Sequence, residues 1–126
     1  MVANKNYLHS DLTEKIIKAA IKVHSHLGPG FVEKIYQRAL EIELKNNQIG
    51  VEREKILKLS YSGVNIGTDK VDFEVDRKVL VELKAVTELS DIHKAQLISY
   101  LKASKHRIGL LINFAQQKLQ VKRVIV

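Results

Sequence analysis

The sequence lacks cysteine and tryptophan, and it has one proline, one methionine and few aromatic residues. Without cysteine, disulfide bonds and thiolate metal sites are excluded, and nothing in the sequence points to an oxidising compartment. No apolar run approaches the roughly 20 residues that a membrane-spanning helix needs, and the first residues contain no apolar signal core. We therefore expect a cytoplasmic protein that does not insert into a membrane.

Proline and glycine are too scarce to form a linker, and no repeat or low-complexity segment interrupts the 126 residues. A chain of this length buries about two-thirds of its unfolded surface, which is enough for one domain to fold without disulfides or metal. We expect a flexible segment over residues 1–9 and a single domain over residues 10–126.

Lysine and arginine outnumber aspartate and glutamate by 21 to 14, which gives a net charge of +7. Such a balance suits a surface that binds a polyanion such as nucleic acid. A lysine-rich solvated surface explains the same charge equally well, so charge alone does not choose between the two interpretations.

Hydrophobic periodicity predicts an α/β fold in which a mixed sheet lies between helices. Asp11 and Glu14 form a predicted capping box for the first helix, and Gly28-Pro29-Gly30 ends it. Ser90 is the predicted N-cap of the last helix. The predicted helices cover residues 11–27, about 31–47 and 90–103, and the predicted strands cover residues 51–61, 64–75, 78–86, 106–114 and 119–126.

The stretch VDFEVDRKVLVELK carries acidic residues where a strand usually carries Val, Thr or Lys. A three-residue turn would pair Val75 with Val79 and place Asp72 opposite Glu82, whereas a two-residue turn would separate the two acids. Because side chains alternate along a strand, Lys84 then shares a face with both acids. The opposite face carries the apolar residues Val71, Phe73, Val81 and Leu83.

Two carboxylates that face each other across strands, with α carbons on the order of 5 Å apart, repel and destabilise the sheet. Lys84 could compensate as a surface salt bridge, which is the ordinary role of an isolated Glu-x-Lys on a strand. A divalent cation compensates better, because Mg²⁺ is bound by one or two carboxylates together with waters and phosphate oxygens. An ammonium group beside that cation would orient an attacking water. Asp72, Glu82 and Lys84 together suggest phosphodiester hydrolysis.

Other polar residues have ordinary interpretations. Glu33 lies in the first turn of a predicted helix, where the helix dipole favours an acid in any protein. Gln96 and Tyr100 lie four residues apart, and a partly buried polar seam on that helix accounts for them. Glu74 and Asp76 lie nearer the hairpin tip and are predicted to be solvated.

Two segments resemble a known family. Asp72, followed after nine residues by Glu82-Leu83-Lys84, resembles the core motif of the PD-(D/E)xK nuclease superfamily. The segment GFVEKIY, residues 30–36, is similar to the signature of the GxxExxY protein family within it. The similarity continues through VELKAV, AQLISYLK, GLLINF and VKRVIV. Val71 departs from the superfamily pattern, in which proline often precedes the aspartate.

The resemblance implies a restriction-endonuclease-like core, with a central mixed β-sheet flanked by α-helices. It implies a hydrolase that uses Mg²⁺ or Mn²⁺ to activate a water for attack on nucleic acid, with DNA favoured over RNA. The products would carry 5′-phosphate and 3′-hydroxyl ends. A homodimer or a protein partner would supply specificity that so short a chain has little room to encode.

The resemblance also implies the site residues. Glu33 would bind the metal through water or hold a second ion, and Gln96 would orient the lysine or contact the nucleic-acid backbone. The implied catalytic residues are Glu33, Asp72, Glu82, Lys84 and Gln96, and the implied metal ligands are Glu33, Asp72, Glu82 and the carbonyl of Leu83.

Two alternative functions fit the same fold. A catalytically inactive nucleic-acid-binding module would bind with steep salt dependence and would not cleave. A non-enzymatic interaction subunit would associate through the C-terminal segment LQVKRVIV, which would be a sticky edge if unpaired. Retention of Asp72, Glu82 and Lys84 together favours the nuclease, because an inactive site could lose Lys84 at little structural cost.

Overall fold

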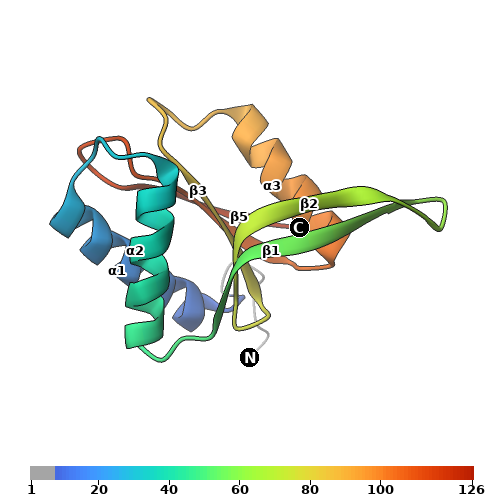
Figure 1. Ribbon diagram of the computed structural model, residues 1–126, viewed down its shortest axis with the longest axis horizontal. Helices are drawn as coiled ribbons and strands as arrows, with labels where there is room; N and C mark the ends of the chain where they lie inside the picture. The colour runs from blue at the N-terminus through green and yellow to red at the C-terminus, as the bar shows by residue number, and fades with distance from the viewer. Residues whose placement is uncertain (1–7) are drawn as a thin grey trace.

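The computed structural model describes residues 8–126, so all but the end of the predicted flexible segment 1–9 lies outside the described residues (Figure 1). Five strands form one sheet in the order β1-β2-β3-β4-β5, and only β3 and β4 are parallel. The predicted α/β fold with a mixed sheet is therefore confirmed. The elements are α1 (Ser10–Leu27), α2 (Glu33–Asn46), β1 (Val51–Tyr61), β2 (Val64–Val75), β3 (Val79–Lys84), α3 (Asp91–Ser104), β4 (Ile108–Asn113) and β5 (Gln120–Ile125).

The helix caps agree only in part with those predicted from the sequence. Ser90 caps α3, and it forms a capping box with His93. The predicted capping box of Asp11 and Glu14 is wrong, because α1 begins at Ser10 and Asp11 lies inside its first turn. Within the described residues no helix is long and apolar enough to cross a membrane.

Apolar residues pack on both faces of the sheet. α1 and α2 cover one face, where Tyr36 and Leu40 pack against Phe73, Val81 and Leu83. α3 covers the other face and has its own apolar cluster. That cluster contains Leu57, Val71, Leu80, Leu89, Leu97, Tyr100, Leu101, Leu111 and Val124.

The prediction that Val71 shares a face with Phe73 is wrong, because the two residues lie in different clusters. The β1–β2 ladder passes from Arg53↔Phe73 directly to Lys55↔Val71, so Glu54 and Asp72 do not pair. Glu54 has a left-handed φ of 54°. This local distortion rotates β2 at Asp72, so residues before and after it face different helices.

β1 and β2 continue beyond the rest of the sheet as a two-stranded arm, which projects past α3 in Figure 1. β3 pairs with β2 only from Phe73 to Val75, so the earlier part of β2 is paired with β1 alone. We call residues 56–70 of this hairpin the arm.

Tyr36 fixes the connection between α1 and α2. Gly28 ends α1 as predicted, with a φ of 74°. The buried hydroxyl of Tyr36 donates to the Gly28 carbonyl (2.5 Å) and accepts from Phe31 N (3.2 Å), while the ring stacks on Phe114 at 4.5 Å. The signature tyrosine therefore sets where α2 begins.

Candidate active site

The turn between β2 and β3 has the three residues that the sequence predicts. Val75 pairs with Val79, and Lys78 N donates to the Val75 carbonyl at 2.9 Å. Asp76 and Arg77 both adopt left-handed φ values, of 50° and 60°. This register brings the two acids of the hairpin together.

β2 separates from β3 at Asp72, where the two carboxylates take the place of backbone partners. The amide of Asp72 donates to Oε1 of Glu82 at 3.0 Å, and the amide of Leu83 donates to Oδ2 of Asp72 at 2.7 Å. Because the N–H and C=O of one strand residue point to the same edge, the carbonyl of Leu83 also faces Asp72. Both acids are thus held where the ladder opens.

Lys84 joins this pair from the end of β3. Its Nζ lies 4.0 Å from Oε2 of Glu82 and donates to Oε1 of Gln96 at 3.4 Å. Gln96 comes from α3, so the ammonium is held between strand and helix, and its side chain is only 17% exposed. The structure therefore brings four predicted residues together, Asp72, Glu82, Lys84 and Gln96.

The electrostatics of the pair are strained in the way that the sequence predicts. Burial, and next the negative charge of Asp72, raise the pKa of Glu82 from 4.5 to about 8, and Lys84 offsets only part of this rise. Without a cation, the site therefore favours the neutral form of the Glu82 carboxyl group at neutral pH.

Tyr100 lies beside the same acids on the buried face of α3. Burial, followed by the charges of Glu82 and Asp69, raises the pKa of its phenol. The hydroxyl therefore remains protonated, and it can only be a neutral donor or acceptor at the site.

Gln37 is a site residue that the sequence analysis missed. Its side chain is buried in α2, and Nε2 donates to Oδ1 of Asp72 at 2.8 Å. Oε1 is buried and has no hydrogen-bond partner within residues 8–126. Gln37 lies four residues after Glu33, and this helical spacing was the signal that could have placed both on one face.

Glu33 does not complete a cluster of three acids. It is exposed at the first position of α2. Across the part of the chain that the structure describes, no three His, Asp or Glu side chains group closely enough to hold a metal ion. A contact of Glu33 with the site through water stays a prediction.

The side chains at this site nevertheless fit a hard divalent cation. Two carboxylates repel each other, the Leu83 carbonyl faces Asp72, and the buried amide oxygen of Gln37 has no partner among the described residues. All of these donors are oxygens, which Mg²⁺ and Mn²⁺ prefer.

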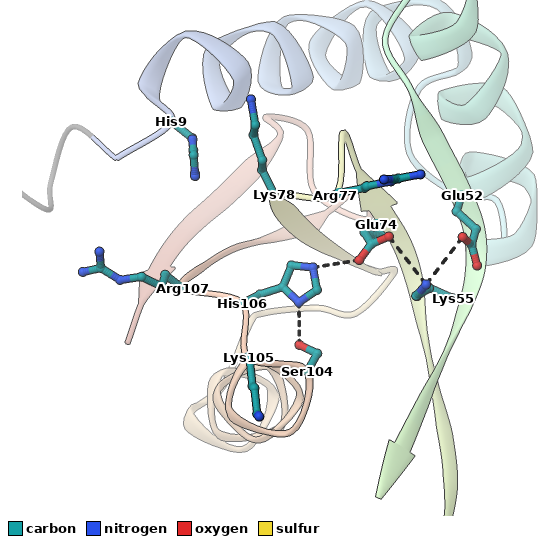
Figure 2. A pocket seen from close by; sticks show the side chains of 10 residues that line it. All are labelled: His9, Glu52, Lys55, Glu74, Arg77, Lys78, Ser104, Lys105, His106 and Arg107. Atoms are coloured by element: carbon teal, nitrogen blue, oxygen red, sulfur yellow. Dashed lines mark hydrogen bonds and ion pairs between the residues drawn. The ribbon is translucent and has the colours of Figure 1, made fainter.

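A separate cavity of about 620 Å³ opens near the β2–β3 turn and the end of α3 (Figure 2). His106 lies between Oε2 of Glu74 and Oγ of Ser104, at 2.8 Å from each, and Lys55 lies 3.6 Å from Glu74. The prediction that Glu74 is solvated is therefore wrong, because its side chain is paired and 11% exposed. None of the acids or the lysine of the candidate site lines this cavity.

Comparisons with known proteins agree with the fold. The family model described as the PD-(D/E)XK nuclease superfamily matches residues 10–124. A solved structure described as "Crystal structure of SSO0001" is similar, with a TM-score of 0.58 and 21% identity over 73% of this chain and 48% of that chain. The present chain thus spans about half the length of that neighbour, and the likeness shows the fold alone. No curated protein matches the sequence. The finer resemblance to the GxxExxY family stays a prediction.

Proposed function

This chain belongs to the PD-(D/E)XK nuclease superfamily, and from that premise we propose that it is a Mg²⁺- or Mn²⁺-dependent nuclease that hydrolyses phosphodiester bonds of DNA. The observation that carries the proposal is the position of Lys84, whose Nζ lies 4.0 Å from the buried carboxylate of Glu82, which faces the carboxylate of Asp72. A purely structural salt bridge would not require the second acid, Asp72, which raises the pKa of Glu82.

The cation would be held by Asp72, Glu82 and the carbonyl of Leu83. When bound, a divalent cation supplies a Lewis acid that activates water and offsets phosphate charge. Gln37 orients Asp72 through its hydrogen bond, so one carboxylate oxygen is fixed before substrate arrives.

Lys84 positions the attacking water, and its positive charge offsets the negative charge that develops on the phosphate. Gln96 accepts from Nζ and limits the positions that the lysine side chain can take. Charge already in place at the reacting atoms needs no rearrangement during the reaction, which is why such a lysine accelerates it.

The test of this function is cleavage by the purified chain. Supercoiled plasmid, single-stranded DNA and RNA are each incubated with Mg²⁺, Mn²⁺ or EDTA, and product lengths are followed. We expect DNA cleavage that EDTA abolishes. If the chain binds DNA but cleaves none of the substrates, the proposed nuclease function is wrong and the chain is a nucleic-acid-binding module. If the chain neither cleaves nor binds the nucleic acids, the non-enzymatic interaction subunit becomes the better interpretation.

Gln37 provides a prediction on metal affinity. Gln37→Leu keeps a similar volume but removes the donor to Asp72, so we expect the affinity for Mn²⁺ to fall about tenfold, as is typical when a group that orients a ligand is lost. Titration calorimetry measures this. The matched control is Gln117→Leu, the same substitution at an exposed position, which should leave the affinity unchanged. Equal affinities in the two variants would remove Gln37 from the site.

A further inference from the structure

We propose that the arm holds duplex DNA, with one face of the hairpin lying in the major groove beside the scissile phosphate. This inference rests on the proposed nuclease function and names its substrate class. The groove-binding face, as we call it, consists of Ile56, Lys58, Thr68 and Lys70, and the exposed Ile66 lies beside it at a bulge of β2.

Packing shows which face of the arm is free. Leu57 and Val71 belong to the apolar cluster under α3, so the odd-numbered positions of this part of β1 and β2 face that helix. Side chains alternate along strands, and Ile56 pairs with Lys70 while Lys58 pairs with Thr68, so these four side chains share one face. Ile66 lies beside them, where the register of the ladder shifts. The groove-binding face therefore points away from α3.

The free face lies on the same side of β2 as the candidate catalytic acid. Lys70 Nζ lies 4.0 Å from Oε1 of Glu54, which also binds Lys34 of α2 at 2.5 Å. Asp72 is held by Gln37, which is likewise a residue of α2. Lys70 precedes Asp72 by two residues on β2, a distance of about 7 Å along a strand.

The composition of this face matches a nucleic-acid groove. All five side chains are exposed, the two isoleucines by 57% and 65%, and none is acidic. Isolated exposed apolar residues need no explanation, but two on the same short arm beside two lysines indicate a contact surface. Lysines contact phosphates, and apolar side chains contact the methyl group of thymine.

The shape of the arm selects duplex DNA. The major groove of B-form DNA admits a two-stranded β-ribbon, whereas the major groove of duplex RNA is deep and narrow. The arm is such a ribbon, because beyond β3 its two strands pair only with each other. A groove held there would lie next to Asp72, which follows Lys70 by two residues on β2.

The test measures binding in EDTA, where no cleavage occurs. The double variant Lys58→Gln and Lys70→Gln is compared with the control Lys22→Gln and Lys45→Gln, in which Lys45 matches Lys70 at 62% exposure. Fluorescence anisotropy of a labelled DNA duplex is followed against salt. Two lost phosphate contacts should reduce the slope of log K against log[salt] by about 1.8. The control variant should show the same salt slope on duplex DNA as the wild-type chain. On duplex RNA, the arm variant and the control should both show the slope that the wild-type chain shows on RNA.

Three results would overturn the proposal: an unchanged slope in the arm variant, an equal change with duplex RNA, or a wild-type dimer that Ile66→Asp converts to a monomer. The last would show that a second copy of the chain covers this face. Failure of the nuclease proposal is separate. If the arm variant changes the salt slope but the wild-type chain never cleaves, the arm proposal stands and the nuclease proposal fails. If the wild-type chain cleaves but the arm variant leaves the salt slope unchanged, the nuclease proposal stands and the arm proposal fails.

Discussion

Lys84→Ala is expected to lose metal-dependent cleavage, by about 10² to 10⁴-fold or more in rate. The ammonium lies between the carboxylate pair and α3, 4.0 Å from Oε2 of Glu82, and donates to Gln96. Alanine removes that charge from the reacting phosphate and leaves both carboxylates in place. Initial rates of plasmid nicking in Mg²⁺ measure the loss.

The same variant should keep its affinity for Mn²⁺, because a cationic lysine is not a metal ligand. Lys102→Ala, which removes an exposed lysine from α3, serves as the control and should cleave at the wild-type rate. Equal rates for Lys84→Ala and wild type would remove Lys84 from the mechanism. A loss in both variants would instead indicate a general requirement for positive charge.

Glu82→Gln is expected to stabilise the chain in metal-free buffer at neutral pH. Because folding raises the pKa of Glu82 from 4.5 to about 8, the folded state binds the proton more tightly than the unfolded state. The contribution to stability is complete below pH 4.5 and is lost as the pH rises towards 8. Glutamine stays neutral throughout, so the free energy of unfolding should exceed that of wild type by roughly 4 kcal/mol at pH 8 and by little at pH 4.

Urea denaturation in EDTA at a series of pH values measures this difference. Asp72→Asn should give a smaller gain, because it removes the neighbouring charge but not the burial of Glu82, which is the larger cause of the raised pKa. Asparagine can still accept from Leu83 N and donate to the free Oε1 of Gln37. A lower stability of both variants at pH 7 would show that the pair is a structural element instead of a strained site.

The hairpin could be predicted because its determinants are local. Three turn residues fix the register of Val75 and Val79, and the register determines that Asp72 meets Glu82. Gly28 and Ser90 likewise mark helix ends from their own backbone preferences. Each of these features depends on residues that are close in the chain.

The missed features depend on contacts between distant segments. Gln37 reaches Asp72 from 35 residues away, and His106 reaches Glu74 from 32 residues away. The rotation of β2 at Asp72 also depends on β1, where Glu54 takes a left-handed conformation. Alternation assumes a regular strand, so it misplaced Val71.

The most direct measurement of the central claim is calorimetric titration of Mn²⁺ into the wild-type chain at pH 6.5, in buffers of different ionisation enthalpy. Because burial and the charge of Asp72 raise the pKa of Glu82 to about 8, its carboxyl group favours the protonated form at this pH, and a bound cation must displace that proton. We expect binding with release of about one proton per ion, and loss of that release in Glu82→Gln. Absence of binding, or binding with no proton released, would contradict a metal centre at Asp72 and Glu82.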